Sequence, residues 1–209
     1  MQGEERAWDC LSGLDSSDVC RRSLAILSPS GDGYVLDLFG CPVTVAPERR
    51  VISGSCADSE WLLTKMAYFS HLAILHYLIG AQAIPLSGRL IRTSDLKAGP
   101  IYYQGSHTLP LDALAARYAT NAEAFLAQGI RFGGSRQPYG DAALVLVPFP
   151  RIPVTFVLWR EDEEFAARAD LLFDASCEQH VPADILWSIA VLAVKVMLRE
   201  RKEAYDHAR

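Results

Sequence analysis

Residues 132–176 read FGGSRQPYGDAALVLVPFPRIPVTFVLWREDEEFAARADLLFDAS, and no other part of the chain says more about its fold. Two runs rich in β-branched and aromatic residues, 142–147 and 154–159, lie on either side of a proline-rich connection at 148–153. Its three prolines fix the backbone and remove hydrogen-bond donors, so a rigid turn is expected between two strands. A third short strand is expected at 171–173, after an acidic segment.

The preceding part of the chain predicts further strands and short helices. Residues 34–38 and 41–45 flank a Phe-Gly pair, which is typical of a β-hairpin. Residues 15–18 offer N-caps for a helix over 19–27. Short strands are also expected at 51–52, 90–92 and 101–103, and helices at 111–118 and 121–128.

The most apolar helix is predicted at 61–81, with the sequence WLLTKMAYFSHLAILHYLIGA. At 100° per residue its apolar positions cover almost the whole circumference, so this helix is expected at the centre of the protein. A long C-terminal helix is predicted at 182–202, with Pro182 in its first turn. Because hairpins and helices mix without a regular βαβ order, we expect one α+β domain over residues 1–209. Its mainly antiparallel sheet should pack against these two helices.

Composition excludes several classes of protein. The net charge of −5 and the lack of a Lys/Arg-rich stripe argue against nucleic-acid binding, which requires neutralisation of phosphates. The first residues lack the pattern of a secretory signal, and the longest apolar run, 185–194, is too short to span a bilayer. We therefore expect a cytoplasmic protein without a membrane segment, and the sequence leaves its oligomeric state open.

The five cysteines are Cys10, Cys20, Cys41, Cys56 and Cys177. They form no C-x-x-C pair, so we expect no iron–sulfur cluster, structural zinc site or disulfide scaffold, and mostly buried, reduced thiols. Cys177 and His180 have the spacing of half a metal site, but no second pair accompanies them. We expect them on the surface before the last helix, and no metal site is predicted.

A set of short motifs is spread over most of the chain. The motifs are Trp8, LDSSDV at 14–19, LHYL at 75–78, IPLSG at 84–88, GDAA at 140–143, PRIP at 150–153, Trp159 with DEEF at 162–165, and LFDAS at 172–176. Together they resemble the prokaryotic family grouped as domain of unknown function 3786. That family is similar to proteins of anaerobes, and some members carry an iron–sulfur domain of the corrinoid-protein type.

The resemblance implies an accessory or ligand-binding role near one-carbon or corrinoid metabolism. It implies no established activity. It also leaves the cofactor open, with a corrinoid or haem-like tetrapyrrole as one candidate.

Polar side chains of these motifs form the candidate ligand site: His76, Tyr77, Ser87, Arg151 and Asp174. Small-molecule pockets combine an apolar wall with a few fixed polar groups, and these segments supply both. His76 and Tyr77 would offer directional hydrogen bonds, or His76 an axial ligand to a tetrapyrrole metal, and Arg151 would contact an anion. For His76 the alternative is a hydrogen bond within the core. For Arg151 it is a salt bridge to Asp141 or Asp174.

Residues 161–164, with the sequence EDEE, form an acidic turn between two predicted strands. Four consecutive carboxylates in a turn cannot all converge on one cation. Two interpretations remain. One is a solvated turn that protects a strand edge, with Arg160 and Arg168 as ion-pair partners. The other is a contact surface for a protein partner.

Two functions are compatible with these observations. The first is a ligand-binding or accessory protein for a small molecule, linked by the resemblance to anaerobic one-carbon or corrinoid metabolism. The second is an enzyme with a non-standard polar active site that acts on a small anionic substrate. The chain has no recognisable nucleophile–base pair and no glycine-rich phosphate loop, which favours the first function.

Overall fold

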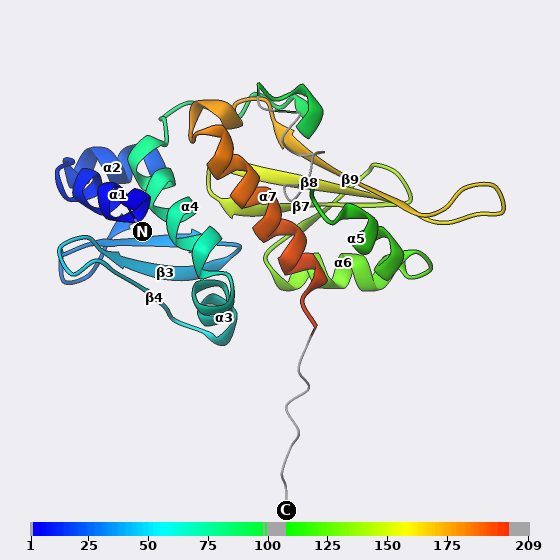
Figure 1. The fold of residues 1–209 in the computed structure, drawn as a ribbon, viewed down its shortest axis with the longest axis horizontal. Coiled ribbons are helices and arrows are strands. Elements are labelled where there is room, and N and C mark those ends of the chain that lie inside the picture. Colours follow the sequence, from blue (N-terminus) through cyan, green and yellow to red (C-terminus); the bar gives the residue numbers. More distant parts are fainter. Residues whose placement is uncertain (1, 98, 100–107, 201–209) are drawn as a thin grey trace, which may run out of the picture.

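The computed structural model describes residues 2–97, 99 and 108–200. These residues form two antiparallel sheets with helices packed against them (Figure 1). The α+β class is confirmed, and strands that we expected in one sheet are divided between two. The strand predicted at 101–103 lies outside the described residues.

The first sheet contains the N-terminal strands in the order β1-β2-β3-β4, all antiparallel. Its strands are β1 (Ile26–Leu27), β2 (Tyr34–Leu38), β3 (Cys41–Ala46) and β4 (Val51–Gly54). Phe39 and Gly40, between β2 and β3, have φ values of 52° and 70°, as the favoured two-residue hairpin turn requires. The predicted hairpin is thus confirmed. β2 buries Tyr34, Leu36 and Leu38 on one face.

The second sheet has the order β5-β9-β8-β7-β6 and is also antiparallel throughout. Its strands are β5 (Leu90–Arg92), β6 (Ser135–Gln137), β7 (Ala142–Phe149), β8 (Ile152–Trp159) and β9 (Arg168–Asp174). The predicted hairpin β7–β8 is confirmed, and its register shifts between Leu146 and Phe149. Pro148 lies inside this shift and has no N–H to donate to a ladder, which accounts for the irregularity.

The remaining helices are α1 (Gln2–Ser12), α2 (Ser16–Ser23), α5 (Leu111–Tyr118), α6 (Ala122–Arg131) and α7 (Ala183–Leu198). The helix predicted at 19–27 is wrong at its end. Leu24 adopts the left-handed conformation with φ 61° and closes α2, and Ile26–Leu27 belong to β1. α7 begins after Pro182 as predicted, but it ends at Leu198 because Arg199 has an extended backbone.

The helix predicted at 61–81 is two helices. α3 (Ala57–Lys65) and α4 (Ala67–Gly80) meet at Met66 with a bend of 99°. The hydroxyl of Ser70, near the start of α4, donates to the carbonyl of Leu62 over 2.9 Å. That bond satisfies a carbonyl that the end of α3 leaves without a helical partner. Because apolar residues continue across the bend, their periodicity does not reveal it.

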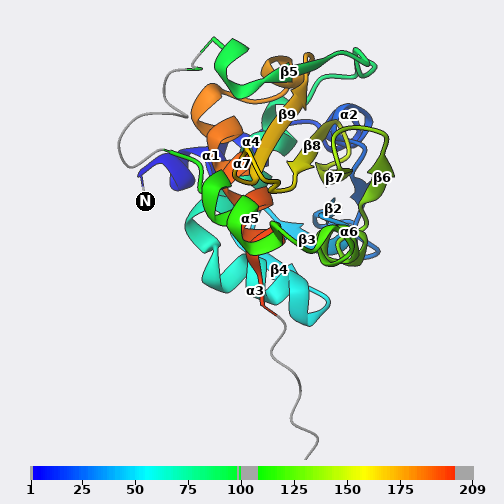
Figure 2. The same ribbon diagram turned by 90° about the vertical axis from the view of Figure 1, so that its right-hand side faces the viewer.

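α4 and α7 lie next to each other at the middle of the molecule (Figures 1 and 2). Buried apolar side chains of both sheets and of the helices around them form one connected cluster. Among the described residues, no single helix is long and apolar enough to cross a membrane, and only the bent pair α3–α4 passes that test by length and composition.

Candidate functional site

Tyr77 links three elements from the end of α4. Its side chain is fully buried, and its hydroxyl donates to the carbonyl of Ser23 over 2.8 Å and accepts the N–H of Arg151 over 3.2 Å. The ring stacks on Phe149 with 4.5 Å between centroids. Burial raises the pKa of Tyr77 far above its usual value, so the phenol is neutral. It joins α2 to the β7–β8 turn.

The guanidinium of Arg151 donates hydrogen bonds to main-chain carbonyls. Nε donates to the carbonyl of Arg22 over 2.5 Å, Nη1 to Ile84 over 2.8 Å, and Nη2 to Arg21 over 3.5 Å. The expected salt bridge to Asp141 or Asp174 is therefore wrong. Carbonyls in the last turn of a helix carry partial negative charge and lack helical partners, so the end of α2 attracts this cation instead.

Asp174 and Ser87, both predicted for the site, are bonded to each other. The carboxylate is 3% exposed and accepts N–H and hydroxyl bonds from Ser87 and Ser176, of 2.6 to 3.0 Å, with a further N–H bond from Gly88. Burial alone would raise the pKa of Asp174, but the bonds from Ser176 and Ser87 outweigh it and lower the pKa to about 2. The ionised side chain ties the loop before β5 to the end of β9.

His76 belongs to neither of these two pairs. It is half-buried on α4 and makes no hydrogen bond with any described residue. Burial lowers its pKa, and the nearby carboxylate of Asp184 at the start of α7 opposes that shift. Four of the five predicted residues thus form two bonded pairs, Tyr77 with the main-chain N–H of Arg151 and Ser87 with Asp174, and His76 belongs to neither.

His180 is a buried residue of this region that the sequence analysis placed on the surface. Both His180 and Cys177 are 1% exposed, because the turn η4 (Cys177–Gln179) passes under the end of α4. There the His180 carbonyl lies so close to Gly80 that a Cβ on that glycine would be 2.6 Å from it. Burial raises the pKa of the Cys177 thiol to about 12. No three metal-ligating side chains converge within the described residues.

The ring of His180 has one partner and one unsatisfied nitrogen. Nδ1 accepts the N–H of Gln82 over 3.2 Å, which leaves the proton of the neutral ring on Nε2. Nε2 is buried and has no hydrogen-bond partner among the residues described. Burial lowers the pKa of His180, the charge of Arg151 lowers it further, and Asp174 opposes both. The ring is therefore neutral at physiological pH.

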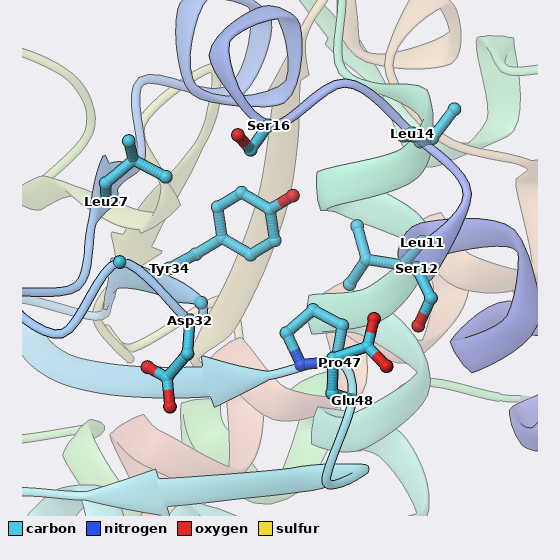
Figure 3. A pocket seen from close by; sticks show the side chains of 11 residues that line it. Leu11, Ser12, Leu14, Ser16, Leu27, Asp32, Tyr34, Pro47 and Glu48 are labelled. Carbon is cyan, nitrogen blue, oxygen red and sulfur yellow. The ribbon is translucent and has the colours of Figure 1, made fainter.

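On the other side of α2 lies a cavity of about 180 Å³ (Figure 3). Its walls come from the end of α1, the connection to the first residue of α2, strands β1 and β2 with the loop between them, and the turn after β3. The apolar part is formed by Leu11, Leu14, Leu27 and Pro47. Its polar side chains are Ser12, Ser16, Asp32, Tyr34 and Glu48.

Tyr34 places an unused hydroxyl in this cavity. The residue is 3% exposed, and its ring projects between Ser16 and Pro47 (Figure 3). Its hydroxyl forms no hydrogen bond with the part of the chain that the structure describes. Burial raises the pKa of Tyr34, so this group is a neutral donor and acceptor. The hydroxyl itself is not fully buried, since among the described residues only His180 Nε2 is a fully buried side-chain atom without a partner, so it can bond a molecule in the cavity.

The two acidic residues at the cavity, Asp32 and Glu48, differ in whether they form an ion pair. Asp32 accepts bonds from Ser28 and Ser30 and forms an ion pair of 3.0 Å with Arg49. Glu48 is exposed and has no ion pair with any described residue. Among the residues that the structure describes, no basic side chain lines the cavity.

A family model described as "Domain of unknown function (DUF3786)" matches residues 15–196. The chain belongs to this family. Neither a curated protein nor a solved structure matches it.

The DUF3786 region includes both bonded pairs, His180 and Tyr34, whereas Leu11, Ser12 and Leu14 of the cavity precede it. In this member of DUF3786, α1 therefore completes a cavity whose other residues lie almost entirely inside the matched region. The sequence alone did not predict this cavity, because Tyr34 lies in a run of residues typical of a strand. The available signal was a tyrosine at an inward-facing strand position, where a hydroxyl requires a partner.

Proposed function

We propose that this DUF3786 protein binds a small organic molecule in the cavity beside Tyr34. The observation that carries the proposal is Tyr34, a residue that is only 3% exposed, whose hydroxyl has no partner among the described residues and faces a space of about 180 Å³. An engineered protein cavity of about 150 Å³ holds benzene, so a ligand of that size fits here. Apolar walls with one fixed polar group are typical of small-molecule sites.

The lining indicates a neutral or cationic ligand. Leu11, Leu14 and Leu27 would pack against an apolar body, and Tyr34 would bond one polar group. The free carboxylate of Glu48 would favour a positive charge and disfavour an anion. The alternative function, an enzyme for a small anionic substrate, needs a cation in its site. Arg151, the residue expected to supply it, already donates to three main-chain carbonyls.

The link to corrinoid metabolism stays a prediction of the family resemblance. A tetrapyrrole ring is far larger than the benzene-sized cavity, so we propose that such a link involves a small metabolite and not an enclosed macrocycle. The cytoplasmic location expected from the sequence is part of the same proposal. The five thiols are free, as is usual in a reducing compartment.

The β8–β9 hairpin favours an accessory role through a protein partner, because it extends away from the rest of the molecule (Figure 1). At its tip Phe165 is 69% exposed. Asp162 caps the turn by accepting the N–H groups of Glu164 and Phe165 over 2.9 and 2.8 Å. The remaining exposed carboxylates and this phenyl ring would form the contact surface predicted at 161–164.

Three probes of similar shape and different charge test ligand binding: benzyl alcohol, benzylamine and benzoate. Ligand-observed NMR is expected to detect the alcohol and the amine with the wild-type protein, and to detect benzoate weakly or not at all. Tyr34→Phe should weaken binding of the alcohol about fivefold, the value of one neutral hydrogen bond. Tyr68→Phe is the matched control, because Tyr68 is 73% exposed and outside the cavity.

Equal binding of all three probes to the wild type and Tyr34→Phe would overturn the proposal, as would no binding at all. Titration with cobalamin tests the tetrapyrrole alternative separately. A shift of its absorption band that His76→Ala abolishes would support that alternative instead.

A further inference from the structure

Cys41 and Cys56 lie opposite each other on neighbouring segments of the first sheet, although fifteen positions separate them in the sequence. β3 and β4 pair Val43 with Gly54, and continuing that register by two residues places Cys41 opposite Cys56. The hydroxyl of Ser55 donates to the carbonyl of Pro42 over 3.1 Å, so the two segments stay side by side beyond the end of β4.

This arrangement is suitable for a disulfide. Directly opposite residues of an antiparallel pair have Cα atoms about 4.5 to 5.5 Å apart, which lies inside the range of about 4.4 to 6.8 Å that disulfides span. The two thiols are close enough that Cys56 raises the pKa of Cys41 and Cys41 lowers that of Cys56. Both are free thiols in this structure.

The two thiols have unequal surroundings. Cys56 is exposed and caps α3, where its sulfur accepts the N–H of Ser59 over 3.4 Å and lies 3.4 Å from the Ser59 hydroxyl. The bonds from Ser59 lower the pKa of Cys56. Cys41 is buried, and burial raises its pKa to about 12. A helix N-terminus with an accessible thiol is the usual setting of an attacking cysteine, and a covered neighbour that of a resolving one.

The carboxylate beside the pair, Asp58, is neutralised by two arginines. Asp58 lies in the first turn of α3, and its carboxylate pairs with Arg131 over 2.6 Å and with Arg199. Asp58 raises the pKa of Cys41 and Arg199 lowers it. The carboxylate therefore opposes thiolate formation less than an unpaired aspartate would.

We propose that Cys41 and Cys56 form a site of thiol–disulfide exchange that reacts with low-molecular-weight disulfides. The Cys56 thiolate attacks one sulfur of the disulfide RSSR, which forms Cys56–S–S–R and releases RS⁻. RS⁻ takes up the proton that Cys56 lost. Cys41 then gives up its proton and attacks the Cys56 sulfur, which forms the Cys41–Cys56 disulfide and releases a second RSH. The two cysteines are oxidised, and RSSR is reduced to two RSH.

The test uses the full-length reduced protein and oxidised glutathione, followed by acid quenching, alkylation and peptide mass spectrometry. We expect the wild type to lose two thiols, to retain no glutathione on Cys56, and to yield a peptide with Cys41 joined to Cys56. Cys41→Ser should retain one glutathione on Cys56, because the resolving thiol is absent. Cys56→Ser should leave Cys41 reduced, because the buried thiol is not accessible to the reagent.

Cys10→Ser is the matched control, because Cys10 is also exposed but no other cysteine pairs with it across a strand. This variant should form the Cys41–Cys56 link as fast as the wild type. Cys41→Ala replaces Cys41→Ser if the serine variant does not fold. A wild-type protein that keeps glutathione on Cys56, or in which Cys10 reacts while Cys56 does not, would overturn the proposal. Neither cysteine lines the Tyr34 cavity, so this outcome is independent of ligand binding there.

Discussion

The main-chain N–H of Arg151 donates to the hydroxyl of Tyr77 over 3.2 Å, and the same hydroxyl donates to the carbonyl of Ser23 over 2.8 Å. One buried phenol therefore connects the β7–β8 turn of the second sheet to the end of α2, beside the first. The side chain of Arg151 strengthens this connection, since it bonds the neighbouring carbonyls of Arg21 and Arg22. These two family-motif residues hold the C-terminal end of α2 in place, and Ser16 at the other end of this helix lines the Tyr34 cavity.

Replacement of Tyr77 by phenylalanine is expected to destabilise the protein by about 1–3 kcal/mol, because it leaves the Ser23 carbonyl and the Arg151 N–H buried without their partner. Urea unfolding followed by circular dichroism measures the change. Tyr68→Phe removes the same atom from a side chain that is 73% exposed and should change stability by less than about 0.5 kcal/mol. Equal stability of the two variants would contradict the structural role of this hydroxyl.

Replacement of Arg151 distinguishes a structural role from a ligand-binding role. Because its guanidinium reaches three carbonyls from a rigid fork, Arg151→Ala should lower the free energy of unfolding, and Arg151→Lys should restore only part of the loss. Thermal melting of both variants measures this effect. If Arg151→Ala melted like the wild type and lost binding of the probe ligands, the anion-contact role predicted from the sequence would be correct instead.

The sequence predicted those parts of the fold that depend on neighbouring residues alone, such as strands joined by a proline-rich turn. Residues 142–149 and 152–159 carry β-forming side chains around a proline turn, and these features alone specify a hairpin. The bend at Met66 escaped prediction, because both α3 and α4 are apolar and partly buried, and helical periodicity continues across it.

The candidate sites depend on contacts between distant segments, and these have no local signal. His180 follows a polar sequence, yet it is buried because the chain passes under Gly80, a hundred positions earlier. Cys41 and Cys56 become neighbours only through the register of β3 and β4. The motifs drew attention to Tyr77, Arg151 and Asp174, but the partners of these residues were not predictable without the fold.

Asp174 should make stability sensitive to strongly acidic pH. Hydrogen bonds lower its pKa from 3.8 to about 2, so its contribution is complete above about pH 4 and is lost as pH falls through the folded-state value. The contribution is about 2 kcal/mol, at 1.36 kcal/mol per pKa unit. The free energy of unfolding of Asp174→Asn, measured from pH 6 to pH 2, should show a correspondingly weaker dependence on pH. Asp37→Asn, at an exposed position of β2, is the control and should follow the wild-type curve.

His180 should make stability sensitive to mildly acidic pH. Burial and the charge of Arg151 lower its pKa below 6.5, and Asp174 only partly compensates. Above about pH 6.5 the ring is neutral in both the folded and unfolded states, so it makes no pH-dependent contribution. As pH falls below that value, the unfolded state takes up a proton that the folded state does not, and stability decreases until pH reaches the folded-state pKa.

The measurement is the urea midpoint at pH 7.5, 6.0 and 5.0 for the wild type and His180→Phe. We expect the variant to lose part of the decrease between pH 6.5 and 5.0, even though it is less stable at neutral pH because the N–H of Gln82 loses its acceptor. His76→Phe must be measured in parallel, because burial also lowers the pKa of His76 and gives the same sign. An NMR titration of the two imidazole rings assigns each part of the effect. A His180 ring that titrates at or above 6.5 in the folded protein would mean that Nε2 has gained a partner, such as a bound water or an anion.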